Sequence, residues 1–151
     1  MRPSIEEYAV GLAIAASSRS EGLVTKVGAA ILDCDGRILS LGYNGLPKKK
    51  VAGATWMDER EERRKFFIHA ECNALSMLSS RESPSLVALT HSPCASCAQL
   101  ISSYLVRKVI FNEEYQGCDE YKEILGFAGI EYELVNTRYT QSIKKAINEN
   151  N

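Results

Sequence analysis

Two short motifs hold residue types that together bind zinc. One residue separates His69 from Glu71, and two residues separate Cys94 from Cys97. Cys94 follows directly after Pro93. One imidazole and two thiolates form a ligand set that suits zinc. The sequence offers no good fourth ligand, whereas a structural zinc site is normally closed by four. Three protein ligands leave one position open for water, which is the arrangement of a catalytic zinc.

Glu71 has the chemistry of a general base at such a site. Zinc lowers the pKa of a bound water to roughly 7, which makes that water a usable nucleophile near neutral pH. A carboxylate beside it can accept the proton and deliver it elsewhere. The pattern H-x-E followed by P-C-x-x-C is typical of zinc-dependent nucleobase deaminases. The two motifs together therefore predict hydrolytic deamination.

Each motif has other interpretations when it is taken alone. The histidine and the cysteines could be buried core residues, a redox dithiol or part of a structural zinc knuckle. A redox dithiol leaves the H-x-E motif unexplained, and a structural knuckle lacks its fourth ligand. The other cysteines, Cys34, Cys72 and Cys118, are interpreted as packing residues, and His91 as a neutral residue at the rim of the site.

Both ligand groups are expected where a loop enters a helix. Helical periodicity follows from His69 to Ser79, and a second helix is predicted from about Cys94 to Leu105, with Pro93 at its start. The electropositive helix N-terminus favours ionised cysteines. Residues two apart on a regular helix point to nearly opposite sides. His69 and Glu71 can therefore converge only if His69 has non-helical geometry at the start of its helix.

The elements that position these motifs alternate between helix and strand. Ser4 and Glu7 have capping-box spacing for a first helix, with one face predicted from Ile5, Tyr8, Leu12 and Ala16. Asp35-Gly36 predicts a hairpin. Strands are predicted at 27–32, 37–44, 86–90, 109–111 and 130–134, the last with one solvated face, and further helices at 118–128 and from about 137, with a long connection at 46–68.

These elements predict one α/β domain over residues 1–151. Strands joined by helices favour parallel pairing, whereas the first pair is antiparallel. We therefore expect a mixed five-stranded sheet with helices on both faces, in an α/β/α sandwich. The size of 151 residues agrees with a single domain.

Composition narrows the function classes. The formal net charge of −1 disfavours a general affinity for nucleic acid. The start of the chain lacks the pattern of a secretory signal, and its longest apolar run, residues 9–16, is too short to cross a bilayer, so no membrane partner is expected. Five cysteines, an odd number, argue against a disulfide framework and favour a reducing compartment. The sequence therefore predicts a cytoplasmic protein.

The chain resembles the deoxycytidylate (dCMP) deaminases of the cytidine deaminase superfamily. The resemblance extends over residues 5–135 and is carried by K-V-G-A at 26–29, G-Y-N-G-L-P at 42–47, H-A-E-C-N-A at 69–74 and S-P-C-A-S-C at 92–97. The zinc motifs indicate only the superfamily. The G-Y-N-G-x-P element and the Asn-Ala after H-A-E indicate the dCMP branch, which implies conversion of dCMP to dUMP and ammonia for dTMP synthesis, on a cytidine deaminase-like fold.

The resemblance also implies a role for each catalytic residue. His69, Cys94 and Cys97 would bind zinc, and Glu71 would pass a proton to ring N3 and help ammonia leave from C4. The backbone N–H of Ala70 would hold the base carbonyl.

Three further residues complete the substrate site that the resemblance implies. The backbone carbonyl of Ser92 would accept from the departing amino group, and Asn44 would bind the sugar 3′-hydroxyl. Tyr115 would stack near the base. Asn44 could instead be a turn former, and Tyr115 could instead pack at the rim.

Relatives in this branch are homohexamers that dCTP with Mg²⁺ activates and dTTP inhibits. If this regulation carries over, an effector pocket is expected near Lys26, Val27, Gly28, Ala29, Gly42, Asn44, Gly45 and Pro47. The two glycines Gly28 and Gly42 could instead serve close strand packing, and the run at 48–50 could bind phosphate or be a solvated face. Some relatives hold a second zinc in the connection at 46–68, which contains no Cys and no His here, so we expect one zinc per chain.

Three other functions remain open. A tRNA adenosine deaminase would require a basic surface and a pocket open to a polynucleotide, which the near-neutral charge and the G-Y-N-G element disfavour. A dCTP-directed deaminase would carry the same zinc motifs. An inactive nucleotide sensor would not need the proton shuttle that Glu71 represents.

Overall fold

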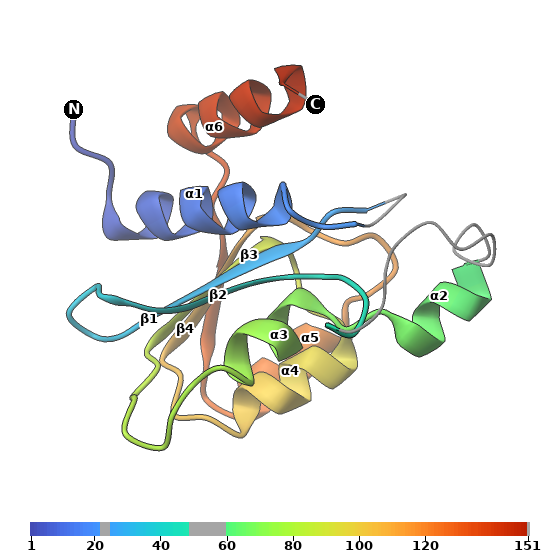
Figure 1. The fold of residues 1–151 in the computed structure, drawn as a ribbon. Helices are drawn as coiled ribbons and strands as arrows, with labels where there is room; N and C mark the ends of the chain where they lie inside the picture. The colour runs from blue at the N-terminus through green and yellow to red at the C-terminus, as the bar shows by residue number, and fades with distance from the viewer. Residues whose placement is uncertain (22–24, 49–59, 151) are drawn as a thin grey trace.

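The structure, a computed structural model, describes residues 1–21, 25–48 and 60–150 (Figure 1). Its elements follow the predicted order, with one additional helix inside the long connection. They are α1 (Ile5–Ser17), β1 (Gly28–Leu32), β2 (Ile38–Tyr43), α2 (Arg60–Phe66), α3 (Ala70–Leu75), β3 (Leu86–His91), α4 (Ala95–Ser102), β4 (Lys108–Glu113), α5 (Glu120–Phe127), β5 (Glu131–Leu134) and α6 (Arg138–Glu149).

The five strands form one mixed sheet in the order β2-β1-β3-β4-β5. The strand β1 pairs antiparallel with β2 and β3, whereas β3, β4 and β5 run parallel. Helices α1 and α6 lie on one face of the sheet, and α3, α4 and α5 lie on the other (Figure 1). The predicted mixed five-stranded α/β/α architecture is confirmed. Because β3 and β4 are parallel, their carboxyl ends meet at one edge, where the segment before α4 begins.

Each face of the sheet has its own hydrophobic core. On β1, Ala29 and Ile31 belong to the core under α3, α4 and α5, whereas Ala30 and Leu32 belong to the core under α1. All five residues of β1 are buried, as expected for a central strand with both faces covered. This strand therefore forms the rigid base on which α3 is placed.

The predicted start of the first helix is correct, but two residues of the predicted apolar face, Ile5 and Tyr8, are exposed. Ser4 and Glu7 form the capping box, with hydrogen bonds of 2.9 and 3.1 Å between side chain and backbone. However, Ile5 is 48% exposed and Tyr8 is 36% exposed. The buried residues are mostly small, namely Ala9, Val10, Gly11, Ala13, Ile14 and Ser17. Leu12 of the predicted face is partly buried against the same core. Small side chains occupy this buried face because they let α1 approach the sheet closely.

The last strand also differs from the prediction. Alternation at 130–134 predicted a strand with one solvated face. Ile130 is buried, but all four residues of β5 are exposed, including Tyr132 at 40% and Leu134 at 52%. The strand lies at the edge of the sheet, where a neighbour on only one side covers it.

The lysines at positions 49 and 50 lie outside the described residues. In the part of the chain that the structure describes, no helix is both long and apolar enough to cross a bilayer.

Candidate active site

The three predicted zinc ligands lie at the N-termini of two neighbouring helices. His69 is the N-cap of α3, and its backbone is extended, with φ −68° and ψ 152°. Cys94 is the N-cap of α4, with φ −72° and ψ 170°, and Cys97 lies in the first turn of that helix. The predicted non-helical geometry of His69 is therefore confirmed. Each helix begins one residue after its predicted start, because His69 and Cys94 are N-caps. The extended backbone turns the imidazole toward the cysteines.

The ligand atoms are close enough to share one metal ion. The Nδ1 atom of His69 lies 3.3 Å from the Sγ atom of Cys97 and 3.6 Å from the Sγ atom of Cys94. All three atoms lie within 4.8 Å of one another. Ligand atoms around a tetrahedral zinc are about 3.5–3.8 Å apart, given the usual zinc–nitrogen and zinc–sulfur bond lengths. The residues therefore fit zinc.

The electrostatics of the two thiols favour a cation. Hydrogen bonds from the Cys97 thiol and from His69 lower the pKa of Cys94 to about 3, so Cys94 is a thiolate at neutral pH. The same hydrogen bond raises the pKa of Cys97, which holds the shared proton until a metal replaces it. The interaction with the Cys94 sulfur raises the pKa of His69. The Cys94 thiolate thus places a negative charge where a zinc ion would bind.

Glu71 lies buried beside this cluster. The residue is 4% exposed, and burial raises the pKa of its carboxyl group. Its side chain also interacts with Cys97. A buried carboxylate with a raised pKa is suited to accept a proton and return it near neutral pH. The structure therefore places the predicted base next to the predicted metal ligands.

The end of β2 lies against the start of α3. Gly45 and Ile68 form an isolated antiparallel bridge, with N–H···O distances of 3.1 and 2.8 Å. The side chain of Asn73 donates to the backbone carbonyl of Tyr43 at 2.8 Å. Asn44 is therefore held beside His69, although 24 residues of chain and one helix separate the two motifs in sequence.

Ser92 and Tyr115 lie next to each other, in and beside the segment that leads to Cys94. The backbone N–H of Ser92 donates to the carbonyl of Glu113 at 2.8 Å, and the Ser92 hydroxyl accepts from the N–H of Tyr115 at 2.7 Å. The Tyr115 ring is 37% exposed and meets the edge of His91 with centroids 6.0 Å apart. The structure thus brings Tyr115 to the segment that carries Cys94. The predicted backbone donor, Ala70, is fully buried at the first position of α3.

His91 is neutral in this environment. Burial lowers the pKa of its imidazole, and the positive charge of Lys144 lowers it further. Its Nε2 atom lies 3.5 Å from Glu113, but that carboxylate is itself paired with Lys144. The other ring nitrogen, Nδ1, lies 3.0 Å from the hydroxyl of Thr90. The interpretation of His91 as a neutral rim residue agrees with these contacts.

Two glycines predicted near an effector pocket have another structural reason. A Cβ atom on Gly28 would lie 1.9 Å from the backbone oxygen of Ala13 in α1. A Cβ atom on Gly42 would lie 2.6 Å from backbone atoms of Ala70 and Ala74 in α3. The two glycines therefore serve close helix packing on opposite faces of the sheet, and the structure does not bring them together in a pocket. The alternative of close packing agrees better with the structure than the effector pocket does, but the neighbours are helices and not strands.

Among the other residues of the predicted effector region, some are buried and some are exposed to solvent. Ala29 is fully buried in the core, and Gly45 is buried beside Ile68. Lys26 and Pro47 are exposed.

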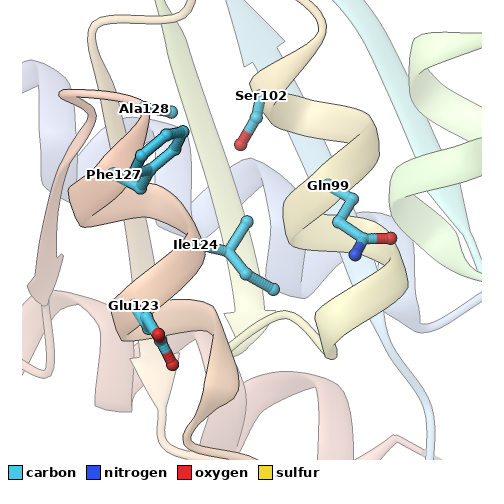
Figure 2. Close-up of a pocket in the computed structure, with 6 residues that line it drawn as sticks. All are labelled: Gln99, Ser102, Glu123, Ile124, Phe127 and Ala128. Atoms are coloured by element: carbon cyan, nitrogen blue, oxygen red, sulfur yellow. The ribbon is translucent and has the colours of Figure 1, made fainter.

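A hollow on the molecular surface lies away from these residues. It lies between α4 and α5, where Ile124 and Phe127 face Gln99 and Ser102 (Figure 2). Its only ionisable lining residue is Glu123. The hollow contains none of the zinc ligands, so the catalytic chemistry belongs to the helix N-termini and not to this hollow.

Cys72 was interpreted as a packing residue, and it lies near the cluster. Burial raises the pKa of its thiol, which also interacts with Cys97. Among the described residues, the group of ligand atoms within 4.8 Å of one another contains only His69, Cys94 and Cys97. Cys72 therefore does not complete a fourfold ligand set in this structure.

Comparison with known proteins agrees with this geometry. Residues 3–113 match the family described as the cytidine and deoxycytidylate deaminase zinc-binding region. A deoxycytidylate deaminase of Mycobacterium phage D29 is 32% identical over 128 residues, which cover 75% of this chain and 98% of the relative. A probable deoxycytidylate deaminase of Drosophila melanogaster is 30% identical over 142 residues, which cover 84% of this chain and 70% of the relative.

A solved structure shows the same fold. The dCMP deaminase from the cyanophage S-TIM5, crystallised in complex with dCMP and dUMP, aligns with a TM-score of 0.73 at 31% identity and covers 89% of this chain and 99% of its own. The matched region contains every predicted zinc ligand and Glu71. The chain therefore belongs to the cytidine and deoxycytidylate deaminase family and is a zinc-dependent deaminase.

Proposed function

We propose that this chain hydrolyses dCMP to dUMP and ammonia. The observation that carries the proposal is the cluster of three ligand atoms within 4.8 Å of one another, with the buried Glu71 carboxyl beside it. Support for the substrate comes from the relatives, which are named as deoxycytidylate deaminases, and from the cyanophage enzyme, which was crystallised with dCMP and dUMP. The product would feed dTMP synthesis.

The chain's own residues have separate tasks in this reaction. His69, Cys94 and Cys97 would hold one zinc ion, which supplies a water of lowered pKa when it is bound. Glu71 accepts a proton from the attacking water, delivers it to N3 of the ring and then assists the loss of ammonia from C4. Burial of Glu71 supports this role, because the carboxyl can hold the proton between the two transfers.

Recognition of the nucleotide is assigned to the surrounding backbone and rim. We assign the base carbonyl to the N–H of Ala70 and the departing amino group to the carbonyl of Ser92. Asn44 would bind the sugar 3′-hydroxyl, which its place beside His69 supports. Tyr115 would stack near the base, and its exposed ring next to His91 supports this position.

We further propose that this deaminase is a cytoplasmic homohexamer regulated by nucleotides. The resemblance to the dCMP branch supports activation by dCTP with Mg²⁺ and inhibition by dTTP. Because Gly28 and Gly42 pack against helices, the accessible residues Lys26 and Pro47 are the better candidates for an effector contact. We retain Val27 and Asn44 as candidates between them.

A substrate panel tests the proposal directly. Ammonia release would be measured at fixed zinc with dCMP, dCTP, CMP, deoxycytidine and adenosine in tRNA, each with and without added dCTP or dTTP. We expect the highest kcat/KM for dCMP. Preference for dCTP or tRNA would assign another reaction to the same site, and no turnover of any substrate by the zinc-loaded protein would favour a nucleotide sensor.

A further inference from the structure

The side chain of Asn44 is fixed by a residue that follows the first helix. Ser20 is 6% exposed, and its hydroxyl lies 2.5 Å from the amide oxygen of Asn44 and 2.9 Å from the backbone oxygen of the same residue. Both contacts join positions that are 24 residues apart in sequence. The single hydroxyl hydrogen of Ser20 is therefore directed to Asn44.

Two backbone groups determine which way the Asn44 amide is turned. The N–H of Val27, which can only donate, points to the amide oxygen at 2.9 Å. The carbonyl of Thr25, which can only accept, receives a hydrogen from the amide nitrogen at 3.0 Å. If the amide were turned by 180°, its nitrogen would face the N–H of Val27, donor against donor. Its oxygen would face the carbonyl of Thr25, acceptor against acceptor. The orientation is thus set by groups whose roles are unambiguous.

This orientation limits what Asn44 can offer to a ligand. Its oxygen already accepts from Ser20 and Val27, and one hydrogen of its nitrogen is used by Thr25. The remaining hydrogen of the amide nitrogen can make one further bond, and only as a donor. A group bound there must therefore present an acceptor lone pair.

We propose that Ser20 is a positioning residue that holds Asn44 as a hydrogen-bond donor toward the sugar of the substrate. The inference rests on the proposed function, because it takes the sugar 3′-hydroxyl as the group that Asn44 meets. Ser20 itself does not contact the substrate. It binds the amide oxygen and so leaves the free amide hydrogen for the ligand, which makes the 3′-oxygen the acceptor in this contact.

The test compares two substrates in four proteins. The proteins are the zinc-loaded wild type, Ser20→Ala, Asn44→Ala and the double variant, and the substrates are dCMP and 2′,3′-dideoxy-CMP, which lacks the 3′-hydroxyl. Ser17→Ala is the matched control, because the Ser17 hydroxyl is similarly shielded and donates to the carbonyl of Ile14 within α1 at 2.6 Å. Zinc content and circular dichroism establish that each variant is folded.

We expect Ser20→Ala to lower kcat/KM for dCMP by about 3–10-fold, mainly through KM, which is the range for one lost hydrogen bond. The dideoxy substrate should change by less than about 2-fold, and Ser17→Ala should change neither substrate. In the Asn44→Ala background, Ser20→Ala should have no further effect, since the two residues act as one unit. Equal losses for both substrates, or an unchanged effect of Ser20→Ala without Asn44, would overturn the proposal.

Two results separate this proposal from the function on which it rests. If the wild type does not deaminate dCMP, the proposed function fails. If it does so but Asn44→Ala is fully active, only the sugar contact and the role of Ser20 fail. An analogue with a 3′-ammonium group, which has no acceptor lone pair, adds a measurement that needs no variant. We expect the wild type to turn it over more slowly than the dideoxy substrate, and faster turnover would contradict a donor-only Asn44.

Discussion

The candidate zinc centre and the proposed sugar side of the site are built in different ways. The centre takes its ligands and Glu71 from two short motifs, each at the N-terminus of a helix, and its geometry is decided within a few residues of each motif. On the sugar side, Asn44 is held by Ser20, Thr25 and Val27, which lie 17 to 24 residues away. The proposed chemistry is therefore encoded locally, whereas the proposed positioning of the substrate depends on tertiary contacts.

The largest effect is expected from removing a ligand of the centre. His69→Ala should reduce zinc well below one ion per chain and abolish deamination, because two cysteines alone hold the ion weakly. Zinc would be measured by mass spectrometry of the dialysed protein. The control is His91→Ala, which removes the other of the two histidines and should keep its zinc. Stoichiometric zinc in His69→Ala would show that another residue is the ligand.

Loss of the proton carrier should separate metal binding from catalysis. We expect Glu71→Ala to keep its zinc and its fold but to lower kcat by about 10²–10⁴, the usual contribution of a general acid–base group. Steady-state ammonia release and metal analysis of the same sample make the measurement. Near-normal turnover would show that Glu71 is not the proton carrier. Loss of zinc would show that Glu71 is needed for zinc binding.

A glycine at the junction of the two regions should affect both. Gly42→Ala places a methyl group 2.6 Å from backbone atoms of α3, the helix that begins at His69. Overpacking of this kind costs about 1–3 kcal/mol of unfolding free energy. We expect chemical denaturation to show this loss, with weaker zinc retention, because α3 must shift.

A second glycine supplies the control for this substitution. Gly126 lies in α5 with open space around its Cβ position. Gly126→Ala should therefore leave stability unchanged or raise it by up to about 1 kcal/mol. If Gly42→Ala were equally harmless, the close contact between β2 and α3 would not restrict this position.

The same contrast explains what the sequence could predict. The cluster of candidate ligands, the carboxyl beside it and the extended backbone of His69 followed from residue types and spacing, because each depends on local geometry. The buried face of the first helix did not follow from its pattern. Two faces of that helix carry apolar residues, and the choice between them depends on the close approach of α1 to Gly28.

Contacts between distant segments account for the other differences. The exposed β5 was predicted as half-buried because alternation does not reveal that a strand lies at an edge. Ser20 was not predicted at all, since its partner Asn44 lies beyond two strands and no local motif connects them. Such residues could have been found only from the tertiary structure.

The smallest effect is expected at His91, on the Tyr115 side of the site, and it concerns pH. The groups around His91 are Thr90, Glu113, Lys144 and the ring of Tyr115. Burial and Lys144 lower its pKa in the folded state, whereas the unfolded imidazole titrates near 6.5. The unfolded chain therefore binds the proton first as the pH falls. The neutral His91 contributes stability fully above pH 6.5 and loses it as the pH falls through the lowered folded value.

Replacement of His91 should remove this pH dependence. We expect the unfolding free energy of the wild type to fall more steeply below pH 6.5 than that of His91→Gln, as measured by urea denaturation of zinc-loaded protein. Protonation of the zinc ligands affects both proteins and cancels in the difference. A steeper fall in His91→Gln would mean that Glu113 keeps the imidazole protonated despite Lys144. The rim beside Tyr115 would then carry a positive charge instead of a neutral imidazole.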